Sequence, residues 1–307
     1  MYRHNQNLER DIYVKKPVII GEWKTLFRPV KAGCYVNDHS LVQDHRGAWH
    51  LFGITSHDGS PANERYFVHA RAEQLISDEE MEEIGIVIDH GTRAWSPGVI
   101  QNKKQYYMYY GPSPTKLAIS EDLNEWMGYE IGMCGQPPMS CHRDHFVMKL
   151  NEYTWMMYVA GVKDGYGAIS CLVSNDLLNW RFVQYALTSE DDAPLKPGWG
   201  AFESPYVVKY GEFYYLFVTY TDCSIGNYQN TLVFASTNPY CFGTYTKSRH
   251  QEMVVAELCA HAGEVLFDEC TNSYYITTCG WRDYGIPIEG GVGIAKLEWQ
   301  HSSVGHL

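Results

Sequence analysis

Short runs of apolar and aromatic residues recur along the chain, and polar turns separate them. Runs of this length, rich in aromatic and β-branched residues, are typical of β-strands. Five of them resemble one another and begin roughly 50 to 60 residues apart, at 49–53, 106–110, 155–159, 213–217 and 274–278. Each predicted strand follows another across a short turn, at 40–43, 98–101, 145–149, 206–209 and 264–267. A third strand follows each pair, at 67–70, 116–119, 168–172, 232–235 and 292–295.

This repeat predicts an all-β fold, a single five-bladed β-propeller, because one four-stranded blade has about this length. Two near-identical turn motifs, at 120–126 and 174–180, both end in Trp and support the repeat. We expect residues 1–307 to form one catalytic domain, with blades at roughly 34–75, 92–130, 140–185, 199–245 and 258–299. The alternatives are a β-sandwich or two small β-domains.

One segment, residues 76–83, has a different pattern and is the only helix candidate. Ser77 or Asp78 could cap its first turn, and acidic residues follow, as helix N-termini favour. We expect it to be an insertion between blades with a solvated acidic face.

Acidic residues stand where three of the predicted first strands begin. Asp38, Asp144 and Glu203 each lie eleven residues before an aromatic residue of the following strand (Trp49, Trp155 and Tyr214). Because the inner strands of a propeller surround its axis, we expect these three side chains to occupy equivalent positions and to converge. A single acid at a strand end is most simply a turn cap, but three at matched offsets indicate a site.

Three carboxyl groups close together raise one another's pKa and titrate as a coupled set. Glycoside hydrolysis needs such a set, because one carboxylic acid protonates the leaving oxygen and a second carboxylate activates water or attacks the sugar. Glu203 is the natural acid, since its apolar neighbours Phe202, Pro205 and Trp199 would raise its pKa.

Other residues near the predicted strand ends are candidates for binding substrate. A Trp face stacks on a sugar ring, although a buried Trp is ordinary core, and Arg143 would orient its neighbour Asp144 or form a surface ion pair. Arg282 would bind a hydroxyl or carboxylate, or be a solvated charge. The full set of candidates is Asn37, His39, Trp95, Ser96, Arg143, Trp281 and Arg282.

The composition limits the classes of ligand and partner that the protein is expected to bind. Aromatic residues reach 14%, which suits strands and sugar stacking, and the net charge of −12 without basic runs disfavours nucleic acid and anionic membranes. No signal peptide or membrane span is evident, and the nine cysteines form no CxxC pair. We therefore expect a cytoplasmic protein with free thiols and a small-molecule or oligosaccharide substrate, and a homo-oligomer is left open.

At the acidic positions the sequence resembles the clan of five-bladed propeller glycosidases, which contains glycoside hydrolase families 43 and 32. The resemblance implies that Asp38 is the general base, as in family 43, or the nucleophile, as in family 32. Asp144 then tunes the pKa of the acid and stabilises the transition state, and Glu203 is the general acid. His261 resembles a blade-five His that helps hold a hydrated calcium ion on the axis, so a structural calcium is expected, although no cofactor is required.

His39 and His145 replace prolines that are usual in these families, a departure that bears on the substrate. The chain ends just after the fifth blade, without room for the C-terminal β-sandwich of family 32, so a family 43-like, inverting enzyme is the expected match. It would cleave a terminal furanoside or xyloside bond of a small glycan. The alternatives are a retaining fructosidase-like enzyme, a non-catalytic carbohydrate-binding propeller, and a transglycosylase or phosphorylase.

Overall fold

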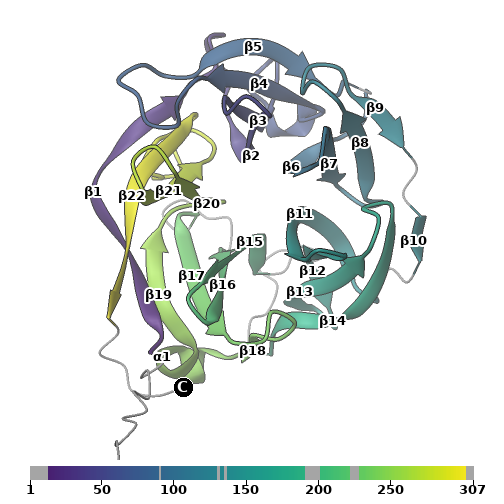
Figure 1. The fold of residues 1–307 in the computed structure, drawn as a ribbon, viewed down its shortest axis with the longest axis vertical. Coiled ribbons are helices and arrows are strands. Elements are labelled where there is room, and N and C mark those ends of the chain that lie inside the picture. Colours follow the sequence, from purple (N-terminus) through teal and green to yellow (C-terminus); the bar gives the residue numbers. More distant parts are fainter. Residues whose placement is uncertain are drawn as a thin grey trace, which may run out of the picture.

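The computed structural model describes residues 13–89, 91–129, 132–134, 137–190, 201–221 and 228–301. Five β-sheets stand around a common axis like the blades of a propeller, which Figure 1 views end on. The predicted all-β class and the single five-bladed propeller are therefore confirmed. In the described part of the chain, no helix has the length and apolar character needed to cross a membrane.

Each blade contains four antiparallel strands in order from the axis outward, apart from one change in blade five. Blade one has β2 (Asn37–Gln43), β3 (Trp49–Thr55), β4 (Tyr66–Ala72) and β5 (Glu82–Val87). Blade two has β6 (Trp95–Asn102), β7 (Gln105–Gly111), β8 (Lys116–Ser120) and β9 (Met127–Tyr129). Blade three has β11 (Ser140–Asn151), β12 (Thr154–Lys163), β13 (Tyr166–Ser174) and β14 (Asn179–Ser189). Blade four has β15 (Phe202–Tyr210), β16 (Phe213–Tyr220), β17 (Asn230–Ser236) and β19 (Val254–Cys259).

Blade five is completed by the N-terminal strand. Its inner strands are β20 (Val265–Asp268), β21 (Ser273–Cys279) and β22 (Val292–His301), and β1 (Lys15–Phe27) pairs antiparallel with β22 as the outer strand. The two ends of the described chain thus lie side by side and close the ring (Figure 1). The expected segment 258–299 lacks this strand, because pairing between distant segments leaves no local pattern.

Blades one, three and four also extend beyond the expected segments, whereas blade two stays within 92–130. Blade one continues to Val87 rather than ending near 75, and the outer strand of blade four is β19, beyond 245. Two short strands, β10 (Gly132–Cys134) and β18 (Gly243–Tyr245), pair in parallel with β14 and cover the outer edge of blade three.

The predicted helix over 76–83 is wrong. Residues 76–81 form bends, and Glu82 begins β5, which pairs with β4. Met81 is buried, and its N–H donates to the carbonyl of Leu26 at 2.8 Å, so the end of β1 holds this segment in place. In the described residues the helices are single turns: 3-10 turns at Pro61–Asn63 and Lys247–Arg249, and α1 at His250–Met253.

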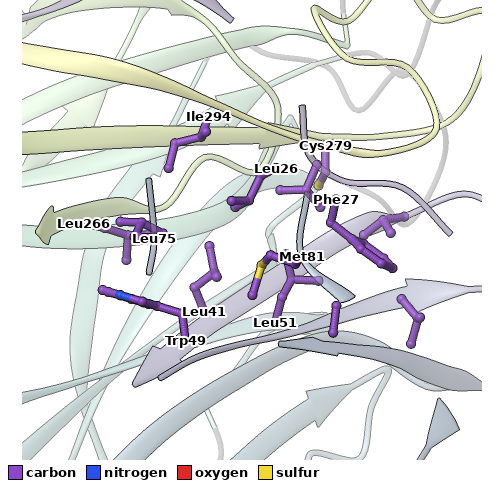
Figure 2. Close-up of a cluster of buried hydrophobic side chains, with 14 of the residues drawn as sticks. Leu26, Phe27, Leu41, Trp49, Leu51, Leu75, Met81, Leu266, Cys279 and Ile294 are labelled. Carbon is purple, nitrogen blue, oxygen red and sulfur yellow. The ribbon is translucent and has the colours of Figure 1, made fainter. Parts of the chain in front are cut away.

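The hydrophobic core lies largely between neighbouring blades. Figure 2 shows the cluster in which side chains of β1, blade five and blade one meet, including Phe27, Leu41, Trp49 and Met81. Comparable clusters join the remaining blades. Because each sheet buries both faces in this way, the blades fix one another around the axis.

A backbone irregularity recurs near the start of each blade's inner strand or just before it. One residue there has a positive φ: Asp38 (46°), Ser96 (47°), Asp144 (57°), Ser204 (48°) and Ala262 (48°). In the first four blades the pairing register shifts at this point, as in a β-bulge. The equivalent of Asp38 and Asp144 in blade four is therefore Ser204, and Glu203 lies one residue earlier than the equal spacing predicted.

Candidate active site

The three acids predicted from the sequence come together at the axis. Asp38 is carried by β2, Asp144 by β11 and Glu203 by β15, the inner strands of blades one, three and four. Asp144 and Glu203 are buried, and Asp38 is partly buried. The convergence follows from the ring of inner strands, because it brings together segments that lie far apart in the sequence.

Two serines join Asp38 to Asp144. The Ser96 hydroxyl lies 2.7 Å from Oδ2 of Asp38 and 2.6 Å from Oδ1 of Asp144. The Ser204 hydroxyl donates to Oδ1 of Asp38 at 2.8 Å, and the Ser204 N–H donates to Oδ2 of Asp144 at 3.0 Å. All four carboxylate oxygens are thereby held by residues at the positive-φ positions of the ring.

Glu203 directly precedes Ser204, the positive-φ residue of blade four, and its side chain pairs with Arg143. The guanidinium donates to Oε1 of Glu203 at 3.1 Å, and its Nε lies 3.5 Å from Oδ2 of Asp144. Burial raises the pKa of Glu203 to about 7; Arg143 opposes this, and Asp144 and Asp38 add to it. A carboxyl group with this pKa is protonated in mildly acidic solution and can give up its proton near neutrality.

The same cause acts on the two aspartates. Burial raises the pKa of Asp38, and the hydroxyls of Ser96 and Ser204 lower it in part. Burial also raises the pKa of Asp144, against the opposing charge of Arg143 and in concert with the charge of Asp38. The pair therefore titrates as one coupled unit rather than as two independent acids.

A cavity of about 270 Å³, here termed the aromatic cavity, opens beside the three acids. The predicted residues Asn37, Trp95, Arg143 and Trp281 line it together with Asp38, Asp144 and Glu203. Its wall is partly aromatic: Trp281 stacks on Tyr228 with 5.0 Å between ring centroids, and the Tyr228 hydroxyl donates to Oδ1 of Asn37 at 3.1 Å. Acids beside aromatic faces suit a carbohydrate ligand.

A second cavity of about 380 Å³, the axial cavity, extends along the axis on the inner strands. It shares Asp38 and Asp144 with the first and is otherwise lined by residues further along these strands, such as Gln43, Gln101 and Glu264. Ser96 lines this axial cavity and bridges the acid pair, whereas it does not line the aromatic cavity.

Besides Ser96, two predicted binding residues do not line the aromatic cavity. His39 lines the axial cavity and bonds Thr277 Oγ1 at 2.7 Å, since a one-residue step along a strand reverses the side-chain direction. Arg282 donates to the carbonyl of Cys34 at 2.8 Å and holds a loop. Trp199, expected beside Glu203, lies outside the described residues.

His261 is buried and neutral in character. Its Nδ1 bonds the carbonyl oxygen of Cys279 at 2.8 Å, its ring stacks on Tyr228, and burial lowers its pKa to about 4. Its Nε2 has no hydrogen-bond partner among the described residues. These residues contain no group of three or more His, Cys, Asp or Glu side chains arranged to hold a metal ion. The structural calcium ion expected at His261 therefore stays a prediction.

Several residues of the site were missed by the sequence analysis. Glu64 reaches the cavity from the loop before β4, Arg93 from the segment before β6, and Tyr228 from a loop of blade four. Ser204 was overlooked because the equal spacing of the acids pointed to Glu203 as the ring position. Ser204 belongs to a series of equivalent positive-φ residues, which are Asp38, Ser96, Asp144 and Ser204. The series is recognised only from the backbone angles, which the sequence does not show.

Comparison with known proteins assigns the chain to a family. A model of the N-terminal domain of glycosyl hydrolases family 32 matches residues 29–285. No curated protein matches the chain. Among solved structures, the family 43 β-xylosidase/α-arabinofuranosidase CoXyl43 from a compost microbial metagenome superposes with a TM-score of 0.63 at 16% identity, covering 94% of this chain and 97% of that one.

A family 32 enzyme and a sucrose-6-phosphate hydrolase are similar to the same degree. The β-fructofuranosidase BmSUC1 of Bombyx mori has a TM-score of 0.62 at 15% identity, over 93% of this chain and 62% of that one. The sucrose-6-phosphate hydrolase of Lactobacillus gasseri has 0.63 at 14%, over 91% and 63%. The present chain spans less than two thirds of either.

The structural likenesses show the fold, and the family model covers most of the chain. The model that matches is that of family 32, whereas the sequence favoured a family 43-like enzyme. The chain belongs to glycosyl hydrolase family 32 and is a glycoside hydrolase with the five-bladed propeller that structures of families 32 and 43 share.

Proposed function

We propose that this glycoside hydrolase cleaves the terminal glycosidic bond of a small glycan, a furanoside or a xyloside, with Glu203 as general acid and Asp38 as the carboxylate that acts at the anomeric carbon. The observation that carries the proposal is the meeting of Asp38, Asp144 and Glu203 at one wall of the aromatic cavity. A terminal sugar suits a cavity of about 270 Å³, which is small for a longer chain.

Glu203 is suited to protonate the leaving oxygen. Its pKa of about 7 keeps it protonated in the free enzyme under mildly acidic conditions, and Arg143 is placed to stabilise the carboxylate that remains. Asp144 is proposed to stabilise the positive charge that develops on the sugar, because it lies beside both other acids.

Asp38 either activates a water molecule, which inverts the anomeric configuration, or attacks the carbon directly, which retains it. Inversion was expected from the sequence. Family 32 membership favours the second course, because the blade-one Asp of that family is the nucleophile. Nuclear magnetic resonance of the first-formed product distinguishes the two, since inversion and retention give opposite anomers.

The reaction is tested with a panel of nitrophenyl fructofuranosides, arabinofuranosides, galactofuranosides and xylosides. The panel covers the activities named for the structures of similar fold, β-xylosidase/α-arabinofuranosidase and β-fructofuranosidase. We expect one glycoside to be hydrolysed and both Glu203→Gln and Asp38→Asn to lower kcat/KM by about a hundredfold or more.

Substrates with different leaving groups distinguish the role of Glu203 from that of Asp38. A nitrophenolate leaves with little protonation, so Glu203→Gln should lose less activity on the nitrophenyl glycoside than on the matching methyl glycoside, whereas Asp38→Asn should impair both alike. Wild-type rates in either variant on an accepted substrate would overturn the assigned role. Binding of sugars without any turnover would instead indicate a carbohydrate-binding propeller.

Three further expectations belong to the proposal: a cytoplasmic location, a homo-oligomer as one assembly state, and a structural calcium ion held through water at His261. The calcium is checked by metal analysis of the purified protein and by thermal stability before and after chelation. An unchanged melting temperature and a calcium-free protein would contradict it.

A further inference from the structure

Glu64 is a buried carboxyl group in the aromatic cavity that the proposed acid chemistry does not use. It follows the short turn Pro61–Asn63 and precedes β4, and its carbonyl accepts the N–H of Ala94 at 3.3 Å, which ties it to the start of blade two. The residue is 4% exposed. A carboxyl group so deeply buried is costly unless it is bonded, so its partners are informative.

The two oxygens of Glu64 have different surroundings. Oε1 accepts hydrogen bonds from the Tyr35 hydroxyl at 2.7 Å and from Nε1 of Trp281 at 3.0 Å. No donor among the described residues is assigned to Oε2. Because Glu64 lines the cavity, an oxygen with lone pairs and no protein donor is available to a ligand there.

The contact with Trp281 joins this oxygen to the aromatic wall. The Trp281 indole is held by its N–H on Glu64 and by stacking on Tyr228, with 9° between the ring planes. Glu64 thus fixes the orientation of an aromatic face while presenting a free acceptor beside it. A flat face next to a hydrogen-bond acceptor matches a sugar ring, which offers C–H groups on one side and hydroxyls at its edge.

The charges of the cavity define the class of sugar. Its lining contains four carboxyl groups, those of Asp38, Glu64, Asp144 and Glu203, and two guanidinium groups, those of Arg93 and Arg143. Arg143 is already paired with Glu203. An excess of carboxyl groups disfavours a glycon with a carboxylate or phosphate, and favours a neutral one that donates from its hydroxyls.

We propose that Glu64 is a specificity-determining residue that accepts hydrogen bonds from hydroxyl groups of a neutral terminal sugar through Oε2. This inference rests on the proposed function for the identity of the site, and it adds a residue that binds the sugar without taking part in proton transfer. Loss of the acceptor should therefore weaken binding of the sugar and leave the chemical step nearly unchanged.

The test compares Glu64→Gln with Glu264→Gln. In Glu64→Gln the side-chain amide oxygen can still accept from Tyr35 and Trp281, while the NH₂ group replaces the free acceptor. Glu264 is the matched control, because it is also a buried glutamate but lines only the axial cavity and is bonded by the N–H of Leu41 at 2.8 Å. Binding of D-fructose, L-arabinose and D-xylose is measured by calorimetry, and KM and kcat on the accepted glycoside.

The measurements are made at about pH 8, where the Glu64 carboxyl group, whose pKa burial raises to about 7, is charged and Oε2 is an acceptor. For Glu64→Gln we then expect the Kd of the bound sugar and the KM to rise about tenfold to a hundredfold, as for loss of a hydrogen bond to a charged group, with kcat within about threefold of wild type at the same pH. Glu264→Gln should leave Kd within about twofold of wild type. Equal Kd values in Glu64→Gln and wild type, with both variants folded by circular dichroism, would overturn the inference.

Calorimetry keeps this inference separate from the proposed function. If the wild type binds one of the three sugars but hydrolyses no glycoside, the proposed function fails, and the Kd of Glu64→Gln still decides the role of Glu64. If the wild type neither binds any of the three sugars nor hydrolyses any glycoside of the panel, both are overturned.

Discussion

Asp38 and Asp144 lie on either side of a single hydroxyl group, with Oγ of Ser96 2.7 Å from Oδ2 of the first and 2.6 Å from Oδ1 of the second. A hydroxyl carries one proton and can donate to only one of the two oxygens. Both contacts are hydrogen bonds when one carboxyl group is protonated and donates to the Ser96 oxygen. The hydrogen bond that Ser96 donates favours a charged carboxylate, so it lowers the pKa of the pair against the burial that raises it.

Substitution of Ser96 should change how this pair titrates. Ser96→Ala removes the shared donor and leaves two carboxylates facing each other, so we expect the apparent pKa on the acidic side of the kcat/KM profile to rise by about one unit. The control is Ser170→Ala, which alters a buried serine in β13 of blade three that bonds the Val159 carbonyl. An acidic limb in the same place in Ser96→Ala and wild type would contradict a coupling through this hydroxyl.

The alkaline side of the profile should report Glu203. A general acid works only while protonated, and burial raises the pKa of Glu203 to about 7, so kcat/KM should fall as the pH rises through about 7. In Glu203→Gln the remaining slow reaction should lose this decline, because glutamine has no proton to release. Rates of both proteins from about pH 5 to 9 test the assignment, which an alkaline limb that persists in the variant would disprove.

Stability should fall as the solution becomes alkaline. Burial raises the pKa of Glu264 to about 8 and of Glu64 and Glu203 to about 7, so the folded chain holds protons that the unfolded chain has released above about pH 4.5. The buried histidines His39, His145 and His261 have pKa values lowered to about 3 or 4 and act in the opposite direction, but only below about pH 6.5.

Between about pH 6.5 and 8.5 these glutamates and the buried thiol of Cys171, whose pKa burial raises to about 12, act in the same direction, so we expect the free energy of unfolding to decrease. Glu264→Gln removes one of the three glutamates and should flatten the decrease by up to about 1.4 kcal/mol per pH unit. Denaturant titrations of both proteins at several pH values measure this. A slope of equal size in the variant would mean that Glu264 is not protonated in the folded protein.

Closure of the ring by β1 should contribute to the free energy of unfolding. Phe27, at the end of β1, is 1% exposed between blades five and one, so Phe27→Ala should lower the free energy of unfolding by about 3–5 kcal/mol. Val30, three residues later, is 82% exposed, and Val30→Ala should change it by less than about 0.5 kcal/mol. Similar unfolding curves for Phe27→Ala and wild type would show that this end of β1 contributes little to holding the ring closed.

The number of blades was predicted correctly from the sequence because each blade is a local unit. A hairpin with aromatic runs leaves the same pattern wherever it occurs, so five repeats are visible without any contact between them. The helix expected over 76–83 failed because its polar, acidic composition says nothing about β4, whose open edge pairs with Glu82–Val87. Tertiary pairing overrode a weak local preference there.

By itself, the sequence determined that acids stand near the mouths of inner strands and that radial repetition brings them together. Only the tertiary structure decided which way each side chain points, because adjacent residues of a strand face opposite sides and the bulge at each positive-φ residue shifts the count by one. It is the folded ring that places Ser96 between two carboxyl groups, turns His39 away from the aromatic cavity and brings Glu64 into it. These are contacts between distant segments, and no local pattern in a chain encodes them.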